Sequence, residues 1–140
     1  MKILIINGPN LNLLGTRNPD VYGNQDFDSY YNELKEALDD IDLEYYQSNI
    51  EGELVEKLQL AKADGILLNA GGFTHTSVSI TDAVEAIETP VIEVHISNPA
   101  AREPYRHTSL LAKNVVGSIA GFGLDSYWVA LLALQSLMDE

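Results

Sequence analysis

The sequence predicts an α/β fold of the flavodoxin-like type. In it, five parallel strands form a doubly wound sheet in the order 2-1-3-4-5, with helices on both faces. Apolar runs such as Ile3–Ile6 and Gly65–Asn69 are continuous rather than alternating, which is typical of strands buried on both faces. They alternate with segments whose apolar residues recur at helical spacing. The chain has 140 residues and no linker or internal repeat, so we expect a single domain over 1–140.

The first half of the chain should contain two strands and two helices. The strand over 3–6 delivers a long polar loop, 7–23, whose four asparagines predict an irregular backbone. The first helix is expected to begin near Asp28, a plausible cap, and to run to Leu38. A strand over 42–48 and a helix over 53–63 follow.

The second half continues the alternation. After the strand Gly65–Asn69, Ser77 or Thr76 can cap a helix over 78–88. Two further strands are expected over 91–96 and 114–120. The chain closes with an apolar helix over 124–138, whose large side chains favour core or subunit contact rather than ligand binding; they are Trp128, Leu131, Leu132, Leu134 and Leu137.

Composition restricts the function. A net charge of −13 opposes binding to nucleic acid or to an anionic membrane, because both need a basic footprint. With no cysteine there is no thiolate nucleophile and no disulfide, and no apolar run approaches about twenty residues, so a cytoplasmic protein is the default expectation. The arginines and histidines fall in loops or at element ends, which favours a local pocket for a small carboxylate; they are Arg17, Arg102, Arg106, His75, His95 and His107.

The predicted strand order brings three loops together. Strands one, three and four are neighbours in it, so their carboxyl ends place the loops 7–23, 69–77 and 95–106 at one edge of the sheet. We therefore expect a crevice there that collects Asn12, Arg17, Tyr22, Asn69, His75, Glu93, His95, Ser97, Arg102 and Arg106.

Two functions of flavodoxin-like folds can be tested against these strand ends. A phospho-accepting receiver domain needs carboxylates there, whereas strands one and three end in Asn7 and Asn69, so that hypothesis fails. A flavin or mononucleotide site would want a phosphate loop that opens straight into a helix. Because Thr74–Ser77 precede a helix, a small-anion or mononucleotide-binding module remains the alternative.

The residue types at the crevice favour acid–base catalysis. His95 can act as acid or base near neutral pH. Tyr22 is a poor base unless its phenolate is stabilised, and Arg17, five residues away, can supply that charge. Asn12 and Asn69 offer neutral donors to a developing oxyanion. This chemistry predicts proton abstraction next to a carbonyl in a carboxylate-bearing metabolite.

The same residues resemble those of a known family over nearly the whole chain. The matching motifs are Gly8–Arg17 with Tyr22 and Gly23, Asn69 with Thr74–Ser77, and Glu93–Asn98 with Arg102 and Arg106. Together they are similar to type II 3-dehydroquinate dehydratase. The resemblance implies a lyase that removes water in trans from 3-dehydroquinate to give 3-dehydroshikimate in the shikimate pathway of aromatic amino acid biosynthesis, without metal or organic cofactor.

The resemblance also implies a role for each residue. Tyr22 would take the proton with help from Arg17, His95 would protonate the departing hydroxyl, and Glu93 would orient the histidine or polarise the site. Asn12 would stabilise the enolate through a water. Substrate contacts would come from Asn69, His75, Ile96, Ser97, Arg102 and Arg106. In a homododecamer, a tetramer of trimers, Asp82 would reach the site of an adjoining subunit, although a helix-terminal acid explains Asp82 equally well.

The chain departs from the usual family pattern in two loops. Ala70–Phe73 lacks the customary proline and tyrosine, and Pro99–Ala101 replaces a segment that commonly contains histidine. We expect these changes to alter loop stiffness and turnover rather than the reaction. No partner is predicted for His107.

Overall fold

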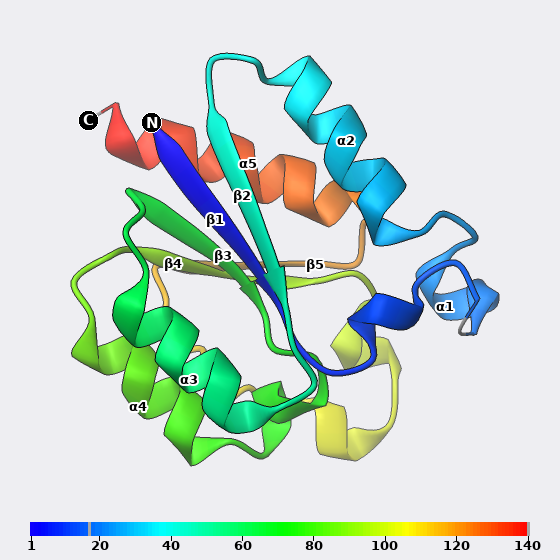
Figure 1. Ribbon diagram of the computed structural model, residues 1–140. Coiled ribbons are helices and arrows are strands. Elements are labelled where there is room, and N and C mark those ends of the chain that lie inside the picture. Colours follow the sequence, from blue (N-terminus) through cyan, green and yellow to red (C-terminus); the bar gives the residue numbers. More distant parts are fainter. Residues whose placement is uncertain (17, 140) are drawn as a thin grey trace.

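The computed structural model describes residues 1–16 and 18–139. Five parallel strands form one sheet in the order β2-β1-β3-β4-β5, which confirms the predicted flavodoxin-like order. The strands are β1 (Lys2–Asn7), β2 (Asp42–Gln47), β3 (Gly65–Asn69), β4 (Val91–His95) and β5 (Gly117–Ala120). Figure 1 shows the sheet running between two layers of helices.

Each face of the sheet is covered by a different pair of helices (Figure 1). On one face α2 (Phe27–Ala37) and α5 (Asp125–Met138) pack, and on the other α3 (Glu51–Leu60) and α4 (Val78–Ala86). In β1 the residues alternate, so that Ile3 and Ile5 join the first core and Leu4 and Ile6 the second. Burial on both faces is the reason that the strands read as continuous apolar runs.

The loop 7–23 is more regular than its composition predicted. It contains a 3₁₀ turn, Leu11–Leu13, and one turn of helix, α1 (Pro19–Tyr22). Pro19 is the first residue of α1, where its fixed φ suits a helix start and its missing N–H costs nothing. The prediction of an irregular backbone was therefore wrong for these two stretches.

Several predicted boundaries also shift. The carboxylate of Asp26, not Asp28, caps α2 by accepting from the Ser29 N–H at 2.8 Å. Ser77 caps α4 and accepts from the Ile80 N–H at 2.9 Å, as one of the two predicted alternatives. The last strand begins at Gly117 rather than at 114, because the Asn114 N–H donates to the carbonyl of Leu111 in a turn instead of pairing with β4.

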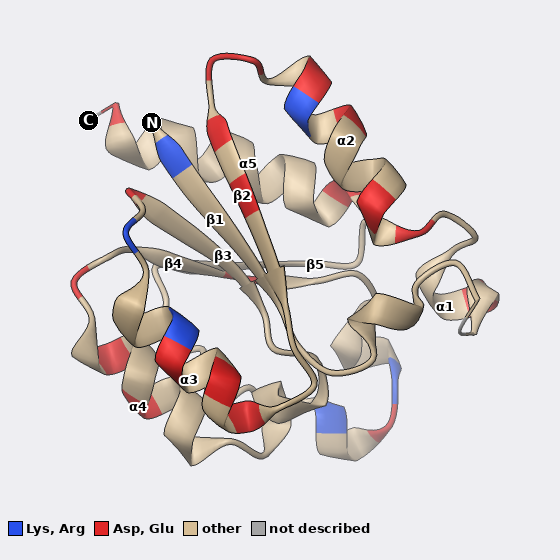
Figure 2. Ribbon diagram, in the orientation of Figure 1, with Lys and Arg blue, Asp and Glu red and all other residues tan. Residues whose placement is uncertain are grey.

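Charge is distributed unevenly over this frame. Figure 2 shows acidic residues spread over the outer surfaces of α2, α3 and α4. Arg102 and Arg106 lie instead in the segment after β4, which contains two short 3₁₀ turns, Pro99–Ala101 and Pro104–Arg106. Within residues 1–16 and 18–139, no helix is long and apolar enough to cross a membrane.

Candidate active site

A cavity of about 120 Å³ opens at the carboxyl ends of β1, β3 and β4. This is the edge at which the predicted order placed a crevice. Most of the predicted site residues line it, namely Tyr22, Asn69, His75, His95, Ile96, Ser97, Arg102 and Arg106. A small concave site lined by convergent polar groups is the usual form of a metabolite-binding pocket.

Close backbone contact joins the loops after β1 and β3. The Gly8 N–H donates to the carbonyl of Asn69 at 2.7 Å. A Cβ at Gly8 would lie 2.6 Å from the carbonyl oxygen of Ala70, so only glycine fits there. Gly71, with φ at +60°, donates its N–H to Oδ1 of Asn69 at 3.1 Å. These contacts fix the floor of the cavity.

Glu93 and His95 form a pair on β4. They are two residues apart on a strand, so their side chains leave the same face, and Nε2 of His95 contacts Oε2 of Glu93. Glu93 is only 2% exposed, and its other oxygen accepts from Ser109 at 2.9 Å and from Ser118 at 3.3 Å. Burial opposes ionisation of Glu93, but hydrogen bonds and charge from His95, with hydrogen bonds from the two serines, outweigh burial and lower the pKa.

Tyr22 faces this pair from the opposite loop. Arg102 donates through Nη1 to the phenolic oxygen of Tyr22 at 2.9 Å and to Oγ of Ser97 at 3.2 Å. The guanidinium carbon also lies 5.5 Å from the centre of the tyrosine ring. A cation in this position favours the anionic form of a phenol. The sequence assigned that task to Arg17, which lies outside the described residues.

Glu103 organises the two arginines from the outer side. Its Oε1 lies 3.7 Å from Nε of Arg102 and accepts from Nε of Arg106 at 3.2 Å. The pKa of Glu103 is lowered to about 2. The hydrogen bond from Tyr105 is the largest cause, and the hydrogen bond and charge of Arg106 add to it. The carboxylate is therefore ionised at any physiological pH.

His75 completes the wall beside His95. Its Nδ1 lies 2.8 Å from the carbonyl oxygen of Thr108 and must donate to it, so that in the neutral imidazole Nε2 is an acceptor. The rings of His75 and His95 are nearly parallel, 16° apart in orientation, with their centres at 6.5 Å. The two imidazoles therefore present adjacent polar edges to one side of the cavity.

Three of the predicted residues that the structure describes do not line this cavity. Asn12 lies in a neighbouring hollow with Asp26 and Gln47. Glu93 lies behind His95, in contact with its Nε2. Asp82 is exposed on α4, where its carboxylate can meet another molecule.

The structure also adds residues that the sequence did not indicate. Ser109 and Ser118 hold Glu93, and Ser118 could have been found because it is the register partner of Glu93 across β4 and β5. His107, for which no partner was predicted, contacts the carbonyl oxygen of Arg102 through Nε2 at 2.9 Å. Six further residues line the cavity. Five of them have no reactive side chain and one carries a side-chain amide; they are Pro9, Leu11, Gly71, Gly72 and Pro99, and Asn10.

The arrangement is suited to moving protons on a small anionic molecule. A phenol beside a guanidinium and an imidazole beside a buried carboxylate line the same cavity, which supplies a base and an acid. Arg102 and Arg106 bring positive charge to a chain that is otherwise strongly acidic.

Known proteins are similar to this chain in sequence and in fold. Residues 1–135 match the model of the family described as Dehydroquinase class II. A 3-dehydroquinate dehydratase from Exiguobacterium sp. is 53% identical over 136 residues, which cover 96% of this chain and 94% of the relative. One from Campylobacter hominis is 44% identical over 144 aligned residues, with 100% and 93% covered. The crystal structure of type II dehydroquinase from Butyrivibrio crossotus matches with a TM-score of 0.92 at 42% identity, covering 96% of this chain and 97% of that one. The chain therefore belongs to the class II, or type II, family of 3-dehydroquinate dehydratases.

Proposed function

We propose that this protein removes water in trans from 3-dehydroquinate to give 3-dehydroshikimate, in the cytoplasm, through an enolate. The observation that carries the proposal is the pairing within one cavity of Tyr22, held by Arg102, with His95, held by Glu93. Family membership names the substrate, and the pairing supplies the two proton transfers that such a dehydration needs.

Tyr22 is the proposed base. As the phenolate it takes the proton from the carbon next to the substrate carbonyl, and the electron pair moves to the carbonyl oxygen as an enolate. Arg102, 2.9 Å from the phenolic oxygen, stabilises the phenolate, and Arg17 is proposed to share that task. Asn12 is proposed to stabilise the enolate through a water, since neutral donors favour charge that develops on oxygen.

His95 is the proposed acid. When the enolate collapses, the carbon–oxygen bond of the leaving hydroxyl breaks, and that oxygen takes a proton from the imidazole to depart as water. Because Nε2 of His95 faces Glu93, the other ring nitrogen is the one directed to the leaving group. Glu93 thus orients the acid and compensates its charge, as a buried carboxylate does for a catalytic histidine.

The remaining cavity residues are proposed to bind the substrate. Arg106 and Ser97 with the backbone of Ile96 suit the carboxylate, because they bring charge and hydrogen-bond donors to one wall. Nε2 of His75 can accept from a substrate hydroxyl, since Nδ1 is committed to Thr108. Asn69 contributes its side-chain amide at the floor.

We also propose a homododecamer built from four trimers, in which Asp82 reaches the neighbouring site. Asp82 follows Val78 by one turn of α4, so both lie on the same side of the helix, and Val78 is exposed at 61%. Further apolar side chains are exposed in the segment after β5 and on α5, including Phe122, Leu132 and Leu137. Exposed apolar groups favour burial by another subunit, and Val78 is the one that shares a side of α4 with Asp82.

The direct test of the activity is an ultraviolet assay of the conjugated enone formed from 3-dehydroquinate. We expect enone formation that persists with a chelator present and a purified protein without colour. A yellow preparation that is inactive on 3-dehydroquinate would favour a mononucleotide-binding module instead. For the assembly, Asp82→Ala should weaken substrate binding or trimer cohesion, and a fully active monomer in sedimentation at assay concentration would contradict the shared site.

A further inference from the structure

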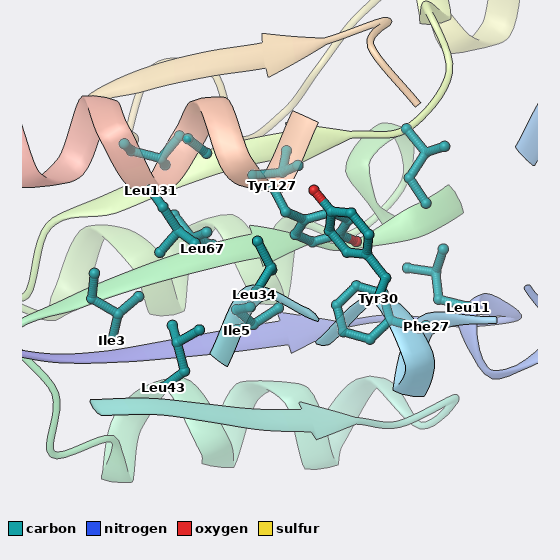
Figure 3. Packing of buried hydrophobic residues seen from close by; sticks show 14 of the residues in the cluster. Ile3, Ile5, Leu11, Phe27, Tyr30, Leu34, Leu43, Leu67, Tyr127 and Leu131 are labelled. Atoms are coloured by element: carbon teal, nitrogen blue, oxygen red, sulfur yellow. The ribbon is translucent and has the colours of Figure 1, made fainter. Parts of the chain in front are cut away.

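A chain of buried hydrogen bonds links α5 to the floor of the cavity. The hydroxyl of Tyr127, whose side chain is 0% exposed, donates to Oδ1 of Asn7 at 2.7 Å. The hydroxyl oxygen of Tyr127 also accepts from Nδ2 of Asn69 at 2.9 Å. Figure 3 shows Tyr127 within the core, beside Tyr30 and Phe27. Asn7 and Asn69 are register partners at the ends of β1 and β3, so one hydroxyl bridges two neighbouring strand ends.

The direction of these bonds is fixed by the partners. Burial raises the pKa of Tyr127 strongly, so the hydroxyl keeps its proton. A hydroxyl has one hydrogen, and Asn7 takes it; toward Asn69 the oxygen can only accept. Nδ2 of Asn69 must therefore face Tyr127, while its Oδ1 accepts from the Gly71 N–H at 3.1 Å. Two contacts thus determine which end of the amide points where.

We propose that Tyr127 is a positioning residue that fixes the orientation of the Asn69 amide for substrate binding. Asn69 lines the cavity although it is only 3% exposed, so what it offers a ligand depends on the rotation of its amide. With one hydrogen of Nδ2 bound by Tyr127, the second hydrogen is directed to the ligand, and a polar group of the substrate, a hydroxyl or carbonyl oxygen, accepts it. This inference rests on the proposed role of Asn69 as a substrate contact.

A purely structural role would affect different measurements. If Tyr127 only stabilised the core, its loss would reduce the fraction of folded enzyme, which lowers the apparent kcat and leaves KM unchanged. A positioning role predicts the opposite pattern. An interaction made equally with substrate and transition state changes KM and spares kcat.

The main experiment is the substitution Tyr127→Phe, with Tyr30→Phe as the matched control. Both replacements remove one buried phenolic oxygen from the same aromatic cluster, but that of Tyr30 donates to Asp125 at 3.1 Å rather than to a cavity residue. We expect Tyr127→Phe to raise KM about 3- to 10-fold, the range of one net hydrogen bond, with kcat nearly unchanged. Tyr30→Phe should leave KM unchanged. Equal KM values in the two variants would overturn the proposal.

Two further variants keep the proposal testable. Asn7→Ala leaves Tyr127 in place but removes the acceptor of its proton, so the hydroxyl is no longer obliged to accept from Asn69; KM should rise here too, even if Tyr127→Phe fails to fold. Asn69→Ala should raise KM and remove the effect of Tyr127→Phe in the double variant. Additive effects in that cycle overturn the positioning role alone. An unchanged KM in Asn69→Ala overturns the substrate contact, and the positioning role with it.

Discussion

The site has two halves that are built differently. Asn69, Glu93 and His95 are strand residues, placed by β3 and β4 and held by partners in the core or on β5. Tyr22, Arg102 and Arg106 are carried on short turns between strands and helices, and their contacts are mostly with one another and with other loop residues. The proposed acid therefore belongs to the sheet, and the proposed base belongs to the loops.

This difference indicates how each half keeps its geometry. Sheet register fixes Glu93 opposite Ser118 and places His95 on the same face, so the acid needs few specific contacts beyond the fold itself. The base is contacted by the guanidinium of Arg102, which reaches both Tyr22 and Ser97. We expect single polar changes in the loop half to affect mainly the rate, and those in the strand half to affect the rate and the stability together.

The largest expected effect is on the base. Tyr22→Phe should lower kcat by about 10²- to 10⁴-fold, the usual contribution of a general base, with little change in substrate affinity. Tyr31→Phe is the control, because the hydroxyl of Tyr31 donates to the carbonyl of Leu43, away from the cavity. Steady-state kinetics of both variants provide the measurement. Substantial turnover by Tyr22→Phe would remove the tyrosine from the mechanism.

A smaller effect is expected for the carboxylate behind the acid. Glu93→Gln keeps the shape but removes the charge that faces His95, so kcat should fall by about 100-fold. It should also destabilise the fold by about 1–3 kcal/mol, because buried hydrogen bonds from the two serines lose a charged acceptor. Ser118→Ala removes only the longer of those bonds and should change both quantities little. Kinetics and denaturant unfolding report the two effects separately.

The close backbone contact between the loops after β1 and β3, at Gly8 and Ala70, should affect stability. Gly8→Ala places a methyl group 2.6 Å from the Ala70 carbonyl, which should cost about 1–3 kcal/mol of the free energy of unfolding. Gly52→Ala in α3 is the control, since no atom lies within 4 Å of its added Cβ, and it should stabilise by about 0.5–1 kcal/mol. A Gly8 variant as stable as the wild type would show that the two loops can separate at little cost.

The guanidinium of Arg102 should have a moderate effect on rate. Arg102→Lys keeps the charge but loses the fork that reaches Tyr22 and Ser97 together, so kcat/KM should fall about tenfold. Ser97→Ala, which leaves the contact with Tyr22 intact, should have a weaker effect on kcat. If Arg102→Lys were fully active, charge alone would be sufficient and the geometry of the fork would not matter.

The smallest expected effect is the pH dependence of stability that comes from Glu93. Its pKa is lowered in the folded protein, so its ionisation contributes stability above the unfolded value of 4.5, and that stability is lost as the pH falls through the folded-state pKa. The difference in unfolding free energy between wild type and Glu93→Gln should therefore shrink as the pH falls below 4.5. A difference that grows on acidification would contradict the assigned direction.

Residue patterns were sufficient for the order of the sheet and for most of the cavity. Continuous apolar runs that alternate with helical segments leave few topologies, because crossovers are right-handed and parallel strands need covered faces. Polar residues at the ends of β1, β3 and β4 had to meet once that order was known. Patterns were insufficient for the loop 7–23, whose helical turns form through contacts that composition does not reveal.

The sequence by itself thus determined the strand order, the edge at which the cavity forms and most of the polar residues that line it, since each depends on local periodicity and on chain direction. Only the tertiary structure decided which groups pair: Arg102 with Tyr22, Ser109 and Ser118 with Glu93, and Tyr127 with Asn69. The partners in these pairs lie between 16 and 80 positions apart along the chain, from Ser109 and Glu93 at 16 to Tyr22 and Arg102 at 80. Hydrogen bonds form only when the donor–acceptor distance is correct to within a few tenths of an ångström. Packing sets that distance, and residue spacing along the chain does not.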